Sequence, residues 1–282
     1  MRIVLTGGTG FIGSHFLLHA LNSGHEIRAI KRKATSRPLL NLSKQPNWIC
    51  KQFTNVQSSD LRGSDVLVHL ACHSTNVPYD SIENCIKSNV LDVIPLFEAA
   101  KTAGITKFIL AGSCFEYGES GNDYEYIPTN APLKPLNSYS LSKSLASLTF
   151  TQWAHENNVS LEILRIFHVF GEGELTSRFW PSLVKAAKNG EDFPMSYGEQ
   201  IRDFQSVELV SKCFLNRAVK MYSEEASCNI FNLNSRNHMS LREFAEREWK
   251  KHGATGKLIF GKYSYRSGES MRLLPGPNSI TI

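Results

Sequence analysis

The first thirteen residues constrain the fold of this chain more than any other stretch. An apolar run at residues 3–5 predicts a buried strand, which is followed by a glycine-rich turn at 7–10 and then by apolar residues with helical spacing. In a strand–turn–helix of this kind, glycines permit the tight turn, a close backbone approach to a pyrophosphate and close helix packing. The helix N-terminus also favours phosphates. We therefore expect a dinucleotide rather than an ordinary glycine turn, contacted by Gly7, Thr9, Gly10, Phe11, Ile12 and Gly13.

Strand and helix patterns alternate along the next 150 or so residues. Strands are predicted at 26–30, 65–71, 107–111 and 161–167, and helices at 81–104 and 138–157. This alternation indicates an α/β fold in which helices cover both faces of a doubly wound parallel sheet. Ligands of such sheets bind at the carboxyl ends of the strands, so we expect Leu70 and Ala71 to contact the cofactor.

The alternation fades after residue 170. We therefore expect a cofactor-binding domain over residues 1–170 and a smaller C-terminal α/β lobe over 171–282 that binds substrate and is interleaved with the first.

Composition narrows the classes of function. The 282 residues, of which 41% are hydrophobic, suffice for one α/β domain and a smaller lobe. Without a membrane-length apolar run or a signal peptide, we expect a cytoplasmic protein with no membrane partner. The six cysteines form no C-x-x-C pair, which indicates buried thiols and no metal site. A net charge of only +5, spread along the chain, indicates no nucleic-acid partner.

The glycine spacing Gly7-x-x-Gly10-x-x-Gly13, together with Thr6 and the residues at 11–12, resembles the TGGTGFIG signature of extended short-chain dehydrogenases/reductases. This resemblance implies a Rossmann fold. It also implies activity on nucleotide-linked sugars, because the family contains mainly dehydratases, epimerases and reductases of such compounds.

The end of the second predicted strand indicates which nicotinamide cofactor is used. A carboxylate there selects NAD, whereas a basic residue accommodates the 2′-phosphate of NADP. This chain has Lys31 and Arg32 at the strand end, and a guanidinium can hold phosphate in bidentate fashion. We expect NADP(H); the alternative is a solvated loop that happens to be basic.

A phenol and an ammonium lie four residues apart at Tyr139 and Lys143, which puts both on one face of the predicted helix. A phenol titrates at about pH 10, and a neighbouring cation can lower that pKa. Ser113 lies four residues before Tyr117, as in the Ser/Thr-x-x-x-Tyr-Gly segment of the family. The resemblance implies that Ser113, Tyr139 and Lys143 are catalytic, and that Tyr139 and Lys143 also contact the cofactor.

The residues after Ser113 discriminate between reactions. Dehydratases of this family place Asp-Glu there, as the acid and base of the elimination. Here the positions hold Cys114 and Phe115, and Glu116 comes one residue too late, so dehydration is disfavoured. We expect these three residues to line the substrate site.

Later segments also resemble family motifs. His168 stands where the family usually has the Asn of L-R-Y-F-N-V-Y-G. Arg202 matches the Arg of G-x-x-x-R-D-F, and Arg266 and Glu269 match R-x-G-D/E. The resemblance implies that His168, Arg178, Arg202, Arg266 and Glu269 bind a substrate diphosphate and its ribose, since arginines pair with phosphate oxygens. A structural histidine and surface salt bridges are the alternatives.

Together these features favour NADPH-dependent reduction of the C4 ketone of a nucleotide-linked 4-keto-6-deoxy or 3,6-dideoxy hexose. Residues 112–118 and 168–181 resemble CDP-abequose and CDP-paratose synthases, which implies a CDP-linked substrate and a role in O-antigen sugar synthesis. The alternatives are a 4-epimerase with tightly held NAD and a non-catalytic NADP-binding regulator. The family resemblance also implies a homodimer, formed through a four-helix contact of residues 88–104 and 138–157.

Overall fold

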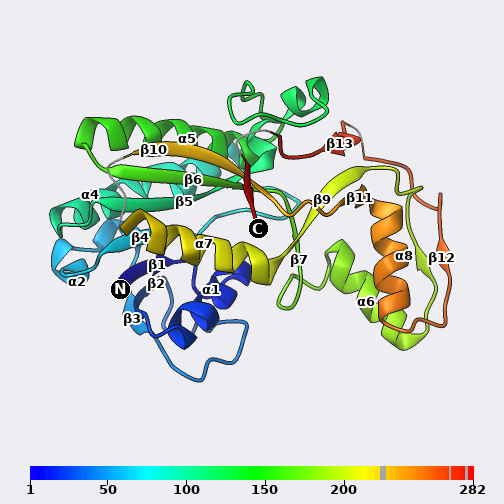
Figure 1. Ribbon diagram of the computed structural model, residues 1–282, viewed down its shortest axis with the longest axis horizontal. Coiled ribbons are helices and arrows are strands. Elements are labelled where there is room, and N and C mark those ends of the chain that lie inside the picture. The colour runs from blue at the N-terminus through cyan, green and yellow to red at the C-terminus, as the bar shows by residue number, and fades with distance from the viewer. Residues whose placement is uncertain (223–226, 267, 277–278) are drawn as a thin grey trace.

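A large parallel sheet organises the computed structural model, which describes residues 1–222, 227–266, 268–276 and 279–282 (Figure 1). Its eight strands run in the order β14-β10-β6-β5-β4-β1-β2-β3, and every neighbouring pair is parallel. The strands are β1 (Arg2–Thr6), β2 (Glu26–Lys31), β3 (Asn47–Cys50), β4 (Val66–His69), β5 (Lys107–Ser113), β6 (Ser160–Ile166), β10 (Cys228–Asn234) and β14 (Ser279–Thr281). The predicted Rossmann-type α/β fold is confirmed.

Helices cover both faces of this sheet, as Figure 1 shows. They are α1 (Phe11–Asn22), α2 (Ser58–Leu61), α3 (Ile82–Ile86), α4 (Ile94–Thr102), α5 (Ser138–Asn157) and α7 (Val207–Tyr222). The strand order reverses between β1 and β4, and the carboxyl ends of these two strands open the crevice in which doubly wound folds bind ligands.

The predicted elements differ from the observed ones in one important place. The helix predicted over 138–157 has the bounds of α5, and the Asn137 side chain caps it by accepting from Ser140 N at 2.9 Å. The helix predicted over 81–104 is present but irregular in its middle: α3 passes into a π-helical segment, Lys87–Leu91, and α4 follows after a two-residue turn, with Pro95 in its first turn. Proline lacks an N–H and is tolerated in a first turn but not in a helix interior.

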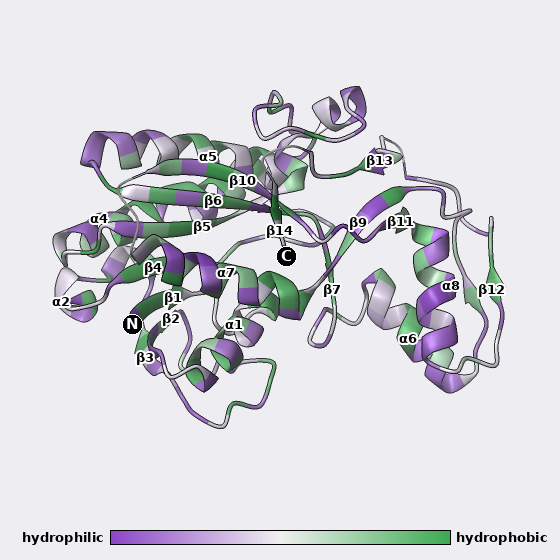
Figure 2. Cartoon of the chain, viewed as in Figure 1, coloured by the Kyte–Doolittle hydropathy of each residue, from purple (hydrophilic) through white to green (hydrophobic). Residues whose placement is uncertain are grey.

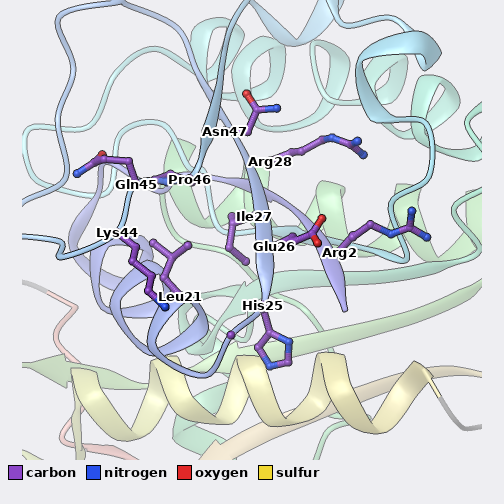
Figure 3. Close-up of a pocket in the computed structure, with 11 residues that line it drawn as sticks. Arg2, Leu21, His25, Glu26, Ile27, Arg28, Lys44, Gln45, Pro46 and Asn47 are labelled. Carbon is purple, nitrogen blue, oxygen red and sulfur yellow. The ribbon is translucent and has the colours of Figure 1, made fainter.

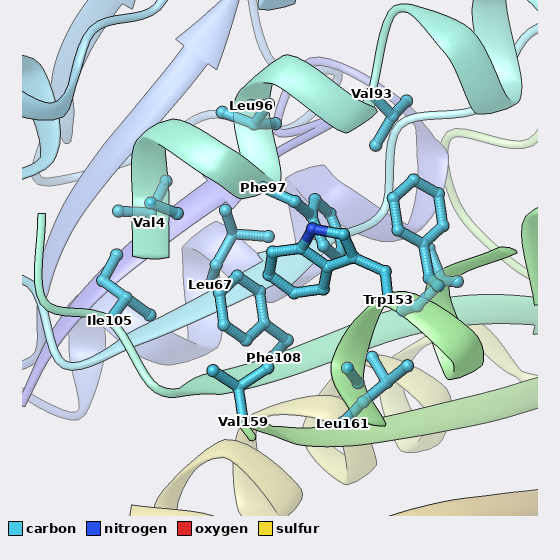
Figure 4. Close-up of a cluster of buried hydrophobic side chains, with 14 of the residues drawn as sticks. Val4, Leu67, Val93, Leu96, Phe97, Ile105, Phe108, Trp153, Val159 and Leu161 are labelled. Carbon is cyan, nitrogen blue, oxygen red and sulfur yellow. The ribbon is translucent and has the colours of Figure 1, made fainter. Parts of the chain in front are cut away.

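Two apolar clusters hold the helices on the sheet. On the α4–α5 face, the Phe97 ring lies 4.3 Å from Phe150 and 5.1 Å from Phe108, with Trp153 edge-on to both Phe97 and Phe108 (Figure 4). On the other face, α1 and α7 pack together around Phe16 and other apolar side chains. Because both faces are covered, the central strands β1 and β4 are mostly apolar, whereas β6 and β10 also carry buried polar residues (Figure 2).

A smaller lobe lies beside the carboxyl ends of these strands (Figure 1). Its elements are β7 (His168–Phe170), α6 (Phe179–Asn189), β8 (Phe193–Pro194), β9 (Ile201–Ser206), β11 (His238–Ser240), α8 (Leu241–Lys251), β12 (Leu258–Ile259) and β13 (Arg272–Leu273). Strands β11, β9 and β13 form a small sheet with β7 beside β9, and β8 pairs with β12.

The chain passes repeatedly between the lobe and the large sheet. After residue 170 it contributes α7, β10 and β14 to the large sheet and all other elements to the lobe. The domain division expected near residue 170 therefore stays a prediction. Over the part of the chain that the structure describes, no helix combines the length and apolar character that a bilayer crossing requires.

The aromatic cluster predicts the response to a core substitution. Phe97→Ala should lower the free energy of unfolding by about 3–5 kcal/mol, because it removes a fully buried ring and leaves a cavity between α4 and β5. Leu209→Ala, at a position 43% exposed on α7, should change it by no more than about 0.5 kcal/mol. Urea unfolding followed by circular dichroism measures both, and equal losses would contradict this assignment of the core.

Candidate active site

The glycine turn brings β1, α1 and the end of β4 into close contact. A Cβ on Gly7, whose φ is +76°, would lie 2.6 Å from Ala71 N, and one on Gly13 would overlap the Gly7 carbonyl oxygen. Gly10 is the N-cap of α1, and within the described residues no side chain caps this helix. The first N–H groups of α1 are thus left for a ligand, next to Thr9, Phe11 and Ile12, and the turn fits a dinucleotide pyrophosphate.

The two basic residues at the end of β2 differ in their surroundings. The Lys31 ammonium donates to the carbonyl oxygens of Ala34 (2.9 Å) and Ser36 (3.1 Å) and lies 4.8 Å from the centre of the Trp48 ring. The ammonium is therefore held by its own loop, and the contact of Lys31 with a cofactor phosphate stays a prediction. Arg32 instead lines a pocket of about 70 Å³ formed by the ends of β2, β3 and β4.

That small pocket also contains Ala71, the residue next to Gly7. Leu70 precedes it, and Leu70 N donates to Thr6 O at 3.3 Å, which ties this loop to the end of β1. Arg32, Ala71 and the glycine turn thus share one edge of the sheet, the edge at which the sequence predicts the cofactor.

Ser113, Tyr139 and Lys143 meet at the end of β5. Ser113 is the last residue of β5, and its side chain lies close enough to Tyr139, in the first turn of α5, to act on the pKa of the phenol. Lys143, one turn further along α5, is buried and donates to Ala111 O at 2.6 Å. The structure therefore brings together the three residues that the resemblance implied to be catalytic.

The pKa of Tyr139 differs from expectation. Burial raises it well above 10, and the nearby Ser113 side chain offsets only part of this rise. Desolvation thus outweighs the favourable interactions in the protein alone, and the lowering of the Tyr139 pKa by Lys143 stays a prediction. At neutral pH the phenol is protonated.

Aromatic side chains form a wall around Tyr139. The Tyr79 ring stacks on it, with 5.6 Å between centroids and 14° between planes. The Phe115 ring lies edge-on to two rings, with its centroid 6.4 Å from that of Tyr139 and 6.1 Å from that of His168. Sequence reasoning missed Tyr79, which belongs to no motif; its position in the loop after β4, where ligand contacts were expected, was the available signal.

His168 is neutral in this environment. Burial holds its pKa well below 6.5, and the nearby charges of Arg202 and Arg178 lower it further. Its Nδ1 atom is buried without a hydrogen-bond partner among the described residues. A neutral imidazole can accept or donate one hydrogen bond, so this atom is available to a polar ligand.

Positive charge converges on these aromatic side chains. Burial raises the pKa of the Tyr79 phenol, and the positive charges of Arg178 and Arg266 oppose that rise. Arg202 is buried, donates to Ser270 O at 2.6 Å and lies 3.7 Å from Glu269. Three arginines from separate segments of the lobe therefore act on the aromatic side chains near Tyr139: Arg178 and Arg266 on Tyr79, and Arg202 and Arg178 on His168.

The residues after Ser113 require a correction. The carboxylate of Glu116 is fully buried, and both its oxygens accept hydrogen bonds from the protein, so it does not line the substrate site as expected. Cys114 is only 1% exposed, and burial raises the pKa of its thiol to about 12. Phe115, at 40% exposed, is the member of the three that reaches the surface, because residues 114–116 form a single 3₁₀ turn.

A larger open pocket of about 370 Å³ lies at the opposite edge of the sheet (Figure 3). Its arginines are already engaged: Arg2 pairs with Asp65 at 3.4 Å, and Arg28 donates to Ser64 Oγ at 2.6 Å. Because this is the amino-terminal edge of the strands, we do not assign the site there. Where the structure describes the chain, it contains no cluster of three side chains suited to hold a metal ion.

Comparison with known proteins identifies the family. The model of the NAD dependent epimerase/dehydratase family matches residues 3–233. The chain belongs to this family. Membership accords with the extended short-chain dehydrogenase/reductase resemblance and supports a nicotinamide dinucleotide as cofactor.

Individual relatives in the family are distant. The chain is 24% identical over 278 residues to CDP-abequose synthase of Salmonella muenchen, covering 96% of this chain and 87% of that protein. It is 25% identical over 276 residues to dTDP-6-deoxy-L-talose 4-dehydrogenase (NAD(+)) of Aggregatibacter actinomycetemcomitans, covering 96% and 98%. Among solved structures, UDP-N-acetylglucosamine 4-epimerase from Methanobrevibacter ruminantium M1 superposes with a TM-score of 0.85 at 22% identity, over 98% of this chain and 89% of that one. At this identity the structural likeness shows the fold.

The glycine turn predicts a selective loss of cofactor binding. Gly13→Ala should weaken dinucleotide binding about tenfold or more, because the added methyl group displaces the Gly7 carbonyl and with it the turn. Titration calorimetry with NADPH and NADH measures the affinity. Gly24→Ala is the matched control, since it strains a positive φ (+78°) far from the turn and should lower stability by about 1–2 kcal/mol without changing affinity. Unchanged affinity in Gly13→Ala would contradict the assignment.

Proposed function

We propose that this chain uses NADPH to reduce the C4 ketone of a nucleotide-linked 4-keto-6-deoxy or 3,6-dideoxy hexose. The observation that carries the proposal is the convergence of the Ser113 hydroxyl, the Tyr139 phenol and buried Lys143 at the end of β5. When bound, NADPH supplies the hydride that C4 receives. Arg32 and the glycine turn would hold its adenosine phosphates, and Lys143 its nicotinamide ribose.

Ser113 and Tyr139 account for the proton that the ketone oxygen receives. Ser113 donates a hydrogen bond to the ketone oxygen, where negative charge develops. Tyr139 transfers its phenolic proton to that oxygen, so the ketone gains a hydride at carbon and a proton at oxygen and becomes an alcohol. The raised pKa of Tyr139 suits this role, because the donor must be protonated at the start. Tyr139 afterwards recovers a proton from solvent.

Reduction is favoured over dehydration by the side chains after Ser113. An elimination needs an acid and a base next to the sugar. Cys114 has a pKa of about 12 and is therefore a neutral thiol, and Phe115 has no titratable group. Glu116 is occupied within the protein.

The cleft chemistry supports a nucleotide sugar as substrate. Arg178, Arg202 and Arg266 supply the positive charge that a diphosphate requires, and neutral His168 offers an unpartnered ring nitrogen. The names of two relatives, CDP-abequose synthase and dTDP-6-deoxy-L-talose 4-dehydrogenase, agree with a deoxysugar substrate. The CDP moiety, the role in O-antigen synthesis, the four-helix homodimer and the cytoplasmic location remain predictions.

A second candidate is a 4-epimerase that retains NAD. The hydrogen bonds of the Lys31 ammonium within its own loop favour this candidate. They leave Arg32 as the one predicted strand-end contact for the 2′-phosphate, the group that NADP has and NAD lacks. One relative is also named as an NAD(+) enzyme. An epimerase would carry NAD through purification, whereas the proposed reductase would consume NADPH. The intact Ser113, Tyr139 and Lys143 argue against a non-catalytic regulator.

The proposed reaction predicts NADPH oxidation with a panel of CDP-, dTDP- and UDP-linked 4-keto-6-deoxy sugars. Absorbance follows turnover, and NMR identifies the C4 alcohol. Tyr139→Phe should lower kcat about 100- to 10,000-fold, because it removes the proton donor. Tyr222→Phe, at an exposed position on α7, serves as the control and should retain turnover. Tightly bound NAD together with no net NADPH oxidation would favour the epimerase instead.

The cofactor preference can be tested at Arg32. Arg32→Ala should raise KM for NADPH about tenfold to a hundredfold and leave KM for NADH nearly unchanged, since a hydrogen bond to a charged group contributes about 1.5–3 kcal/mol. Steady-state kinetics with both cofactors provide the measurement. Lys33→Ala, which removes a neighbouring exposed charge from the same loop, is the matched control. If Arg32→Ala affects NADPH and NADH equally, Arg32 does not hold a 2′-phosphate.

A further inference from the structure

The buried carboxylate of Glu116 links the elements that carry the catalytic residues. Its Oε1 accepts from the backbone N of Ser113 at 2.7 Å. Its Oε2 accepts from Ser147 Oγ at 2.8 Å and from Arg165 Nε at 2.9 Å. One side chain therefore contacts the end of β5, the middle of α5 and strand β6.

The link to α5 falls on the helix face that faces the site. Tyr139, Lys143 and Ser147 follow one another at four-residue spacing, so they lie on the same side of α5. Ser144 adds a second contact, since its hydroxyl donates to the Glu116 carbonyl oxygen at 3.3 Å. Two side chains of α5 thus converge on Glu116, whose carboxylate also holds the end of β5.

The pairing with Arg165 fixes Glu116 from the opposite side. Arg165 also donates to Tyr117 Oη at 2.8 Å and to Thr129 O at 2.9 Å. Tyr117 Oη in turn donates to Asn232 Oδ1 on β10 at 2.6 Å. Apart from the half-buried Thr129, every member of this network is buried, and all are hydrogen-bonded, which makes the geometry rigid.

A buried ion pair of this kind is weak evidence for stability, because desolvation of both charges offsets their attraction. Its position next to Ser113 suggests another use. We propose that Glu116 is a positioning residue, which holds the end of β5 at a fixed distance from α5 so that the Ser113 hydroxyl and the Tyr139 phenol address the same substrate oxygen. This inference rests on the proposed function, in which both groups act on one ketone.

The charge of Glu116 also favours the protonated form of Tyr139, in addition to the positioning contacts that its carboxylate makes. Burial is the main cause of the raised pKa of Tyr139, and the negative charge of Glu116 adds to it. The thiols of Cys72 and Cys114 also face the phenol, but burial raises their pKa values and keeps them neutral. The neighbouring Ser113 side chain opposes the rise. Because Glu116 disfavours the phenolate, it helps to keep the proton on Tyr139 until the ketone receives it.

Glu116→Gln tests the proposal, since a carboxamide has one acceptor oxygen and can satisfy only one of the two sides that the carboxylate joins. We expect kcat to fall about 100-fold, the cost of a small misplacement of reacting groups, with little change in the KM for NADPH. We also expect the basic limb of the pH–kcat profile to move to lower pH, because loss of the negative charge lowers the pKa of Tyr139.

Two further variants keep the test decisive. Glu116→Gln combined with Arg165→Met removes both charges, so that no unpaired guanidinium remains to unfold the protein. Glu162→Gln is the matched control: Glu162 on β6 is equally buried and paired with Arg217 of α7, on the other face of the sheet. This control should lose stability but keep kcat and the pH profile of the wild type.

The titration of Tyr139 can also be followed without a substrate. Phenolate absorbance is measured against pH in the wild type and in Glu116→Gln, each with and without Tyr139→Phe, so that the difference isolates Tyr139. A lower pKa of Tyr139 in Glu116→Gln than in the wild type supports the inference, whether or not a sugar of the panel reacts. If no sugar reacts, that failure counts against the proposed function and not against this inference. Wild-type kcat and an unmoved Tyr139 titration in Glu116→Gln would overturn the inference. So would equal losses of kcat in Glu162→Gln.

Discussion

The close approach of α1 to the turn before it is the constraint on which the rest of the structure depends. A side chain at Gly13 would overlap the Gly7 carbonyl, and one at Gly7 would collide with the backbone at Ala71. Without side chains at these positions, β1, β4 and the start of α1 meet at the point where the strand order reverses. The uncapped helix N-terminus faces this point, and the Arg32 pocket and the Ser113–Tyr139 pair lie along the same edge of the sheet.

Burial determines the chemistry of the groups gathered there. It keeps the Tyr139 phenol and the Cys114 thiol protonated and His168 neutral, so the uncharged forms prevail around the proposed reaction centre. Besides the Lys143 ammonium, the positive charges are those of arginines toward the lobe, which suit a diphosphate. In the proposed complex, hydrogen-bond donors would lie near the ketone and these arginines near the phosphates.

Much of the fold could be predicted because its signals are local. Helix α5 follows from its periodicity and from Asn137 as a cap, and the central strands follow from short apolar runs between turns. The break between α3 and α4 was missed, although Pro95 marks it. In the site, Ser113, Tyr139 and Lys143 were found from family motifs, whereas Tyr79 was not, because its stacking on Tyr139 depends on a loop path that no motif encodes.

The sequence by itself determined the alternation of strands and helices over the first 170 residues, the glycine turn and the candidates for the reacting side chains, since these depend on residue type and short-range spacing. Only the tertiary structure decided which polar groups face a ligand and which are used internally. Glu116 and Lys31 were expected in binding sites, yet one is held by Arg165 and Ser147 and the other by its own loop. The reason is physical: a polar group is satisfied by whichever partners the fold brings within hydrogen-bond distance, and those partners lie on distant segments or depend on how a loop folds back.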